Sequence, residues 1–434
     1  MRQLSWWAIG LSLSGGMLAV TACATPTPSA PSSATSVAPG APTANPAART
    51  PIRLGVMADV SGPFAPQGAE MRINTDLAVK QWNDTGGVDG RPIEAMFADP
   101  KSDAARALDA ATQFVQRDHV DVLVGAVGSN ECAAIEELAL KLQVLYITSS
   151  GCAAEEITAK TCNRYTFRFV PQGRQAQVPL ARYLVSEVGA NWGLLYPDYA
   201  FGQSTLAAFG AGLQEAGGTL SAPIAVPLTE TNLTPYVTKV PADGSIVGIY
   251  DSLTGGQQTS SVTVMQQFGI SQHLRLVVAG GKESFGGIYP DILTGAIFNS
   301  FSPEAKDQFM LDYEQVFRQM AQVDADVANI IGGADHAKPG SQMGYSAFAA
   351  MSALKQSMRA VHYAGPADTP KLIDALAHFK SSQSADFPGG DVMMDPNDHQ
   401  GRMTQYVSQI DGQNEKILLT IPVDQVPPIG SCKV

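Results

Sequence analysis

Few residues in this sequence have the types and spacing that catalysis requires. Asp398 and His399 are adjacent, but neighbours in a chain rarely form a catalytic triad, and no serine in a G-x-S-x-G turn accompanies them. Only 6 histidines are present, and zinc-protease, phosphate-binding and dinucleotide-binding motifs are absent. We therefore expect no enzyme, no catalytic residue, no metal site and no cofactor. A structural or hinge role is expected for Asp398-His399-Gln400.

The first residues have the pattern of an export signal. Arg2 precedes an apolar run from Trp6 to Leu18 that is too short to span a bilayer as a permanent helix. The run ends in Val20-Thr21-Ala22-Cys23, and small residues before a cysteine resemble a bacterial lipobox. We expect residues 1–22 to be a signal peptide and Cys23 to be acylated. The alternative is an uncleaved anchor helix with an incidental cysteine.

Residues 23–50 predict a lipidated cysteine followed by a tether. Six prolines lie among alanine, serine and threonine, and Arg49 is the only charge. Such a segment buries too little apolar surface to fold, and at ~3 Å per residue it would reach up to about 80 Å. The tether would hold the folded part away from the membrane.

Four cysteines remain after Cys23, at positions 132, 152, 162 and 432. An exported chain meets an oxidising compartment, so an even number favours disulfides, with three possible connectivities. We expect Cys152 to pair with Cys162, closing a short loop that would stabilise the fold by about 3 kcal/mol. The spacing offers no zinc or C-x-x-C redox motif.

Composition narrows the class of protein further. At 434 residues the chain is long enough for two domains, and 45% of its residues are hydrophobic against 16% charged. The net charge of −12 argues against nucleic acid, whose binding requires clustered lysine and arginine. The sequence thus predicts a globular α/β protein with no nucleic-acid partner.

Short apolar runs alternate with longer amphipathic stretches from Ile52 onward, which predicts a parallel sheet covered by helices on both faces. The expected strands are 52–58, 93–97, 120–124 and 144–148, and the expected helices are 70–82, 103–117 and 131–141. Ligands in such sheets sit beyond the carboxyl ends of the strands. The loops expected to matter are therefore 61–68, 126–131 and 149–153.

A second series of the same kind follows Arg168. Its expected strands are 191–196, 245–250 and 274–279, its helices 204–216 and 257–269, followed by helices 303–320 and 345–361 and closing strands 406–410 and 417–421. We expect two Rossmann-like lobes joined by a multi-strand hinge. Lobe 1 would comprise residues 51–170 and 303–404, and lobe 2 residues 171–302 and 405–434.

From Ile52 to about Ile421 the sequence resembles the type I periplasmic binding proteins of the branched-chain amino acid branch. The motifs that carry the resemblance are Ser61-Gly62-Pro63-Phe64-Ala65-Pro66-Gln67-Gly68, Trp82 to Arg91, Asp198-Tyr199-Ala200-Phe201-Gly202 and Asp398-His399-Gln400. Each is weak alone, but together they follow the family's order and spacing. The resemblance implies two lobes that close on a small molecule without catalysing a reaction.

The resemblance also implies a ligand site. In relatives a serine hydroxyl and backbone amides of the next two loops hold an amino acid's carboxylate, and the matching positions are Ser129, Ser150 and Cys152. Phe201 matches an aromatic residue that packs on the ligand, and Gln67 matches a pocket border. Ser252 follows a predicted strand of the other lobe. Helix capping by Ser129 and core packing by Phe201 are the alternative interpretations.

One segment departs from the family pattern. Relatives that bind amino acids place a carboxylate near the ligand's ammonium, whereas the best match here falls on Gly281 or Lys282, with Glu283 displaced. A buried ammonium without a counter-charge is unfavourable. Either the ligand is an aromatic or aliphatic carboxylate that Lys282 helps to hold, or a shift of one residue in the match restores Glu283 and an amino acid.

The predicted function is an extracytoplasmic solute-binding lipoprotein of an ABC transporter. We expect a monomer, anchored in the membrane through its lipid, that presents a small-molecule ligand to the permease subunits in the periplasm or at the cell surface. The alternative is the ligand-sensing subunit of a signalling system with the same fold.

Overall fold

The computed structural model describes residues 50–153, 162–171, 173–285, 287–303, 306–334 and 342–429. The chain divides into two units, Met1–Ala47 and Ala48–Val434, and the described residues belong to the second. The predicted signal peptide, Cys23 and most of the tether lie outside the described residues. Within the described part, no helix has the length and apolar character needed to cross a membrane.

The first sheet has five parallel strands in the order β2-β1-β3-β4-β5. The strands are β1 (Ile52–Met57), β2 (Ile93–Ala98), β3 (Val122–Gly125), β4 (Leu145–Thr148) and β5 (Thr166–Arg168). Every residue of β3 and β4 is buried, as expected of a parallel sheet covered on both faces. The predicted parallel arrangement of this sheet is confirmed.

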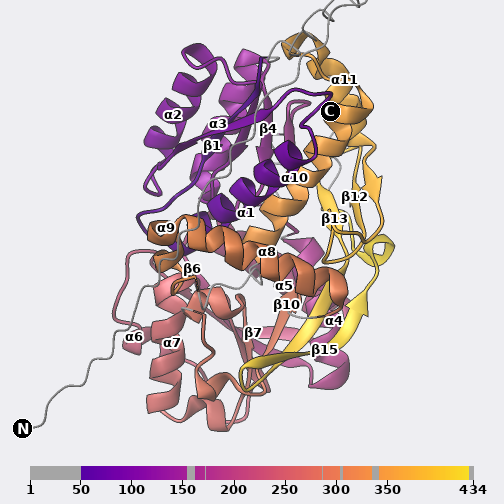
Figure 1. Cartoon of the computed structure of the whole chain (residues 1–434). Coiled ribbons are helices and arrows are strands. Elements are labelled where there is room, and N and C mark those ends of the chain that lie inside the picture. Colours follow the sequence, from indigo (N-terminus) through magenta and orange to yellow (C-terminus); the bar gives the residue numbers. More distant parts are fainter. Residues whose placement is uncertain are drawn as a thin grey trace, which may run out of the picture. The chain divides into compact units, whose positions relative to one another are not determined.

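Helices cover both faces of the first sheet (Figure 1). Alternate residues of β1 and β3 contribute to two different cores, because successive side chains of a strand point to opposite faces. The α2 and α3 helices cover one face, and α1, α8, α9, α10 and α11 pack in the other core. Their bounds are α1 (Ala65–Asp84), α2 (Ala104–Gln116), α3 (Ser129–Leu142), α8 (Gln308–Val323), α9 (Ala325–Ile330), α10 (Gln342–Ala360) and α11 (Thr369–Ala377).

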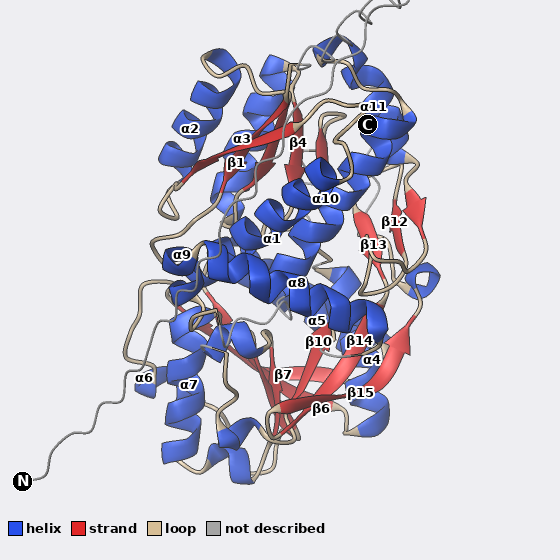
Figure 2. Cartoon of the chain, viewed as in Figure 1, coloured by secondary structure: helices blue, strands red, loops and turns tan. Residues whose placement is uncertain are grey.

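The second sheet is mixed, not purely parallel as the sequence predicted. Its order is β15-β14-β10-β9-β8-β6-β7, and β14 runs antiparallel to both β10 and β15 (Figure 2). The strands are β6 (Asn191–Pro197), β7 (Thr219–Val226), β8 (Gly248–Asp251), β9 (Arg275–Val278), β10 (Ile297–Ser300), β14 (Gln405–Asp411) and β15 (Asn414–Ile421). The helices packed on it are α4 (Arg174–Glu187), α5 (Ala200–Glu215), α6 (Thr234–Val237) and α7 (Gly255–Gln267).

The chain crosses between the two sheets after β5, after β10 and before β14. A third, antiparallel sheet of β11 (Lys380–Ser381), β12 (Val392–Met394) and β13 (Gly401–Met403) precedes the last crossing. Each of the first two sheets, together with the helices packed on it, forms a lobe. We call them the first lobe and the second lobe.

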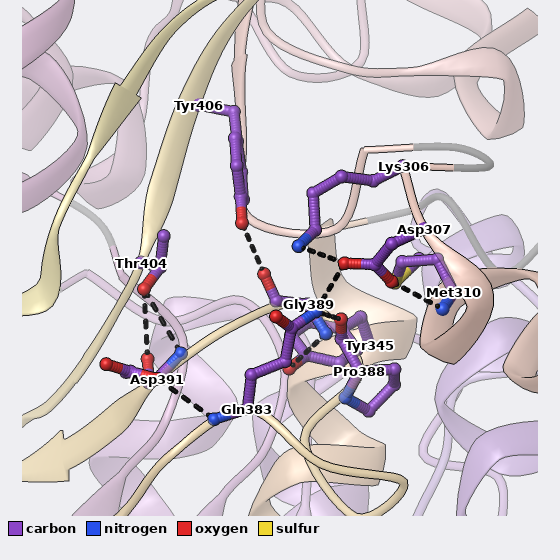
Figure 3. Close-up of polar contacts among 10 residues, drawn as sticks. All are labelled: Lys306, Asp307, Met310, Tyr345, Gln383, Pro388, Gly389, Asp391, Thr404 and Tyr406. Atoms are coloured by element: carbon purple, nitrogen blue, oxygen red, sulfur yellow. Dashed lines mark hydrogen bonds and ion pairs between the residues drawn. The ribbon is translucent and has the colours of Figure 1, made fainter.

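Side chains join two of the crossings in one polar network (Figure 3). Gln383 Nε2 donates to Asp307 Oδ2 at 2.7 Å, and Asp307 also caps α8 by accepting from Met310 N at 3.2 Å. Tyr406 Oη, on β14, donates to Gly389 O at 2.8 Å, while Gly389 N donates to Tyr345 Oη at 3.0 Å. The segments after β10 and before β14 are therefore fixed relative to each other.

The Asp398-His399-Gln400 segment lies at the remaining crossing. The His399 ring stacks on Phe167 with centroids 3.9 Å apart, and Arg168 N donates to His399 O at 3.0 Å. Gln400 Nε2 donates to Val170 O at 3.2 Å. Burial lowers the pKa of His399 to about 4, so the ring is neutral at pH 7. The segment therefore makes structural contacts at this crossing.

Candidate functional site

A pocket lies between the two lobes, where the carboxyl ends of strands from both sheets meet. The atoms around it leave about 290 Å³ of space, which includes open solvent. Its walls come from the segments after β1, β3 and β4 of the first lobe, after β6 and β8 of the second, and from α10. The lining residues are Phe64, Gln67, Val127, Ser129, Gly151, Cys152, Tyr199, Phe201, Thr254 and Met343.

The loops after β3 and β4 form one wall of the pocket and are bound to each other. Cys152 N donates to Val127 O at 3.2 Å, and Ala153 N donates to Ser129 Oγ at 2.9 Å. Gly151 has no room for a side chain, since a Cβ there would lie 1.9 Å from Val127 O. Ser129 is the first residue of α3. The wall is therefore rigid before any ligand arrives.

A disulfide adds a covalent link to this wall, and it corrects the predicted pairing. Cys152 is bonded to Cys132 in the first turn of α3, with Cα atoms 6.0 Å apart, and not to Cys162. The prediction chose the shorter loop, whereas a disulfide needs close Cα atoms. The segment after β4 folds back over the start of α3 and supplies that approach. Cys162 is disulfide-bonded as well.

The turn before α1 places Phe64 at the pocket. Ser61 Oγ donates to Asp99 Oδ2 at 2.6 Å, and Phe64 N donates to Ser102 Oγ at 3.1 Å. The α1 helix begins at Ala65, five residues before the predicted start, because Pro66 suits a first helical turn. Gln67 therefore lies in the helix, with 5% of its surface exposed, and its Oε1 accepts no hydrogen bond from the described residues.

Three aromatic rings line the pocket across the two lobes. The Phe64 and Tyr199 ring centroids are 6.2 Å apart, and those of Tyr199 and Phe201 are 6.0 Å apart. Tyr199 precedes the first residue of α5, and burial raises the pKa of its hydroxyl, which stays neutral. Such spacings allow tilted contacts between the rings.

Four helices begin at the pocket. Gln67 lies in the first turn of α1, Ser129 starts α3, Phe201 is the second residue of α5, and Thr254 precedes α7. Neither Tyr199 nor Thr254 accepts a capping hydrogen bond with its side chain. Because helix N-termini carry unpaired amides and partial positive charge, the pocket favours an anion without a basic side chain.

Two buried carboxyl groups stand behind the first-lobe wall. Glu131, in the first turn of α3, has 1% of its surface exposed, and Asp59, just after β1, has 0%. The two carboxyl groups lie close enough to interact. Glu131 Oε2 accepts from Gly128 N at 2.7 Å, while the buried Glu131 Oε1 and Asp59 Oδ2 have no hydrogen-bond partner among the described residues. Burial, together with the charge of Asp59, raises the pKa of Glu131 to about 8. No sequence pattern predicted this pair.

The structure brings together four of the predicted ligand residues, namely Gln67, Ser129, Cys152 and Phe201, and places the other three elsewhere. Ser150 is buried outside the pocket lining. Ser252 Oγ donates to Leu195 O at 3.0 Å.

Lys282 also lies outside the pocket lining. Its Nζ donates to Gln413 O and sits 5.3 Å from the centre of the Tyr289 ring. The side chain of Glu283 lies outside what the structure describes.

Sequence analysis missed several lining residues. Phe64 and Tyr199 belong to motifs that were identified, but the aromatic partner was expected only at Phe201. Thr254 follows β8 by three residues and Met343 comes from α10. Ligands sit beyond the carboxyl ends of the strands, and this strand-end rule could have identified Tyr199 and Thr254. Met343, in contrast, reaches the pocket through tertiary packing.

A wider cavity adjoins the pocket and shares Phe64 and Thr254 with it. The atoms around it leave about 860 Å³ of space, which includes open solvent, and its further lining includes Pro63, Glu230 and Gln257. The cleft between the lobes thus continues outward from the small pocket. In the described part of the chain, no three His, Cys, Asp or Glu side chains gather closely enough to hold a metal ion.

Residues 51–415 match the family model of the periplasmic binding proteins. The chain belongs to this family. A curated relative, the Leu/Ile/Val-binding protein homolog 3 of Brucella melitensis, is 24% identical over 248 residues, or 56% of this chain. The matched part spans only 57% of that relative's length.

Solved periplasmic binding proteins share the fold. A solute-binding protein of an ABC transporter from Rhodopseudomonas palustris BisB5, in complex with 3,4-dihydroxybenzoic acid, has a TM-score of 0.75 at 16% identity, covering 87% of this chain and 98% of that chain. A leucine-, isoleucine-, valine-, threonine- and alanine-binding protein from Brucella ovis, in a closed conformation, has a TM-score of 0.75 at 18% identity, covering 88% and 98%. The predicted type I fold is confirmed, and the family and these neighbours are solute-binding proteins rather than enzymes.

Proposed function

We propose that this periplasmic binding protein captures a small carboxylate-bearing solute between its lobes and presents it to the permease of an ABC transporter. Closure would bring lobe 1 (51–170 and 303–404) and lobe 2 (171–302 and 405–434) together around the solute. The observation that carries the proposal is the convergence of four helix N-termini on one pocket whose described lining holds no acidic side chain.

Ser129 is the proposed donor to the solute's carboxylate. A hydroxyl carries one hydrogen and two lone pairs, and Ser129 Oγ already accepts from Ala153 N. The O–H therefore remains available to a ligand oxygen. Unpaired amides at the start of α3 would bind the second oxygen, and the disulfide between Cys132 and Cys152 would hold both groups in place.

An aromatic carboxylate is the preferred class of solute. Phe64, Tyr199 and Phe201 offer ring contacts, and a buried ammonium would find no carboxylate among the described lining residues. The Rhodopseudomonas palustris protein, in complex with a dihydroxybenzoic acid, supports this choice. Leucine, isoleucine or valine is the second candidate, supported by the names of the Brucella relatives.

We further propose that the protein is a lipoprotein, monomeric and located outside the cytoplasm, with Cys23 acylated after removal of residues 1–22. The lipobox-like residues before Cys23 and the tether composition support this proposal. Cys23→Ala should release the protein from the membrane fraction, because the tether has no membrane affinity of its own. Equal retention of the variant would refute the anchor.

The experiment for the solute is a thermal-shift screen followed by calorimetric titration. The panel contains benzoate, 4-hydroxybenzoate, leucine, valine, acetamide and urea, so that carboxylate, ring and ammonium vary separately. A true ligand raises the melting temperature by mass action, and benzoates should do so most. Stabilisation by acetamide or urea alone, or turnover of any compound, would contradict the proposal.

A further inference from the structure

The Asp59–Glu131 pair stands directly behind the wall that we assign to the solute's carboxylate. Glu131 is two residues beyond Ser129 on α3, and its Oε2 accepts from Gly128 N at 2.7 Å. Asp59 Oδ1 accepts from Ser102 N at 2.6 Å, so both carboxyl groups are held in place. Neither lines the pocket itself, so the pair touches the solute only through the loop and helix turn that it supports.

Glu131 Oε1 and Asp59 Oδ2 are buried, and each lacks a hydrogen-bond partner among the described residues. A hydrogen bond between the two carboxyl groups needs a proton on one of them, since two carboxylates offer only acceptors. The pair has acidic neighbours. Burial and, to a lesser extent, the like charge of Asp99 raise the pKa of Asp59, and the hydroxyls of Tyr146 and Tyr199 lie within electrostatic reach of Glu131. The charged groups Glu136 and Arg168 also act on Tyr146.

We propose that Glu131 is a positioning residue that shares one proton with Asp59, and that loss of this proton to water weakens the pocket's hold on an anionic solute. The inference rests on the proposed function, because it assumes a carboxylate at Ser129.

Loss of the shared proton weakens anion binding through two effects. A second negative charge behind the wall opposes the positive end of α3, and repulsion between the carboxylates strains the bond from Gly128 N to Glu131. The high pKa of Glu131, about 8, places the change within reach of ordinary buffers.

The size of the effect follows from Coulomb's law. If the separation is taken as roughly 8 Å and the effective dielectric constant as about 20–40, one added charge weakens anion binding by about 5- to 30-fold. Binding and protonation are reciprocal, so an anion that binds near pH 8 must also promote uptake of a fraction of a proton. A purely structural role for Glu131 predicts no such uptake.

The test measures benzoate binding by calorimetry from pH 6.5 to 9.5, in pairs of buffers with different ionisation enthalpies. Wild type should lose about 5- to 30-fold in affinity across this range and take up protons near pH 8. Glu131→Gln keeps an oxygen for Gly128 N and gains an N–H for Asp59, so it mimics the protonated pair. Its affinity should stay high and independent of pH, with no proton uptake.

Two further variants make the test specific. Asp59→Asn keeps an acceptor for Ser102 N and should reproduce the Glu131→Gln result, which guards against poor folding of one variant. Asp76→Asn is the control, since Asp76 is an acid on α1 whose pKa burial raises to about 6 and which does not line the pocket. It should keep the wild-type profile. The same profile in Glu131→Gln would overturn the inference.

The outcomes separate the inference from the proposed function. Benzoate binding that does not change with pH in wild type overturns the inference and leaves the function standing. Absence of binding by benzoate and leucine at every pH refutes the function and the affinity effect together. Infrared spectra of the free protein decide the shared proton independently, because a carboxylic acid band should disappear between pH 7 and 9.5 in wild type and not in Glu131→Gln.

Discussion

Replacing Ser129 by alanine tests the pocket assignment most directly. The hydroxyl has two partners in the proposed complex, since it accepts from Ala153 N at 2.9 Å and would donate to the solute. Ser129→Ala removes the O–H donor, which only the complex uses. Its loss should weaken benzoate binding by about 1–3 kcal/mol. That range corresponds to a Kd about 5- to 150-fold higher. Calorimetric titration at pH 7 measures the change.

The same variant should also destabilise the free protein slightly. The buried N–H of Ala153 loses its acceptor, at a cost of about 1 kcal/mol, or roughly 2 °C in the melting temperature. Ser150→Ala is a matched control from the neighbouring loop, because Ser150 is fully buried, lies outside the pocket lining and has an Oγ with no hydrogen-bond partner among the described residues. Ser150→Ala should change neither the Kd for benzoate nor the melting temperature appreciably. An unchanged Kd in Ser129→Ala, or an equal loss in both variants, would refute our assignment of the carboxylate site.

Three further outcomes are expected. Phe201→Ala should weaken binding of benzoates by about 1–3 kcal/mol through lost ring contact, while the melting temperature of the free protein changes little. The same titration measures the change, and an unchanged affinity would place the ring outside the site. Mass spectrometry of the unreduced protein should find a disulfide between Cys162 and Cys432, because Cys132 and Cys152 are already paired and Cys23 is assigned to the lipid. A free thiol at Cys162 would contradict this pairing. Above pH 6.5 the free energy of unfolding should fall as pH rises toward 8. Burial raises the pKa of Glu131 to about 8 and of Asp251 to about 7, so the native state holds protons that the unfolded chain has released. Chemical denaturation that shows rising stability between pH 6.5 and 8 would be inconsistent with this prediction.

Sequence patterns located the fully buried elements well. The strands β3 and β4 are apolar along their whole length and are bounded by loops, so their predicted positions agree with the structure to within two residues. The pattern missed β7, where exposed and half-buried residues alternate at the sheet edge and Pro223 interrupts the run. It also missed α4, which contains Pro179. In both elements tertiary packing outweighs the local breaker.

Strand direction was beyond the reach of local patterns. The sequence predicted closing strands near 406–410 and 417–421, and the structure has β14 and β15 there. The antiparallel pairing of β14 with β10 depends on contacts between segments more than a hundred positions apart. Because a strand's residue pattern does not state its neighbour, the sheet was wrongly expected to be of the same parallel kind as the first.

The site shows the same limit at the level of side chains. The strand-end rule places a Cα near the cleft but does not say where its side chain points. Ser129 and Phe201 do line the pocket. For Ser252 the hydroxyl turns back to Leu195 O, and the Lys282 ammonium reaches Gln413 O on the β14–β15 turn. Both residues lie at positions where a binding protein could carry ligand contacts, and both are used for local structure instead.

The Asp59–Glu131 pair shows why such a feature escapes sequence analysis altogether. A glutamate three residues after Gly128 has the spacing of an ordinary helix cap, and capping does occur. Its meaning changes only because β1 and β3 are neighbours in the sheet, which puts Asp59 beside the capping carboxyl and leaves one proton for two acids. A cap thus becomes a titrating group behind a proposed anion site, so that stability and affinity should respond to pH through the same proton.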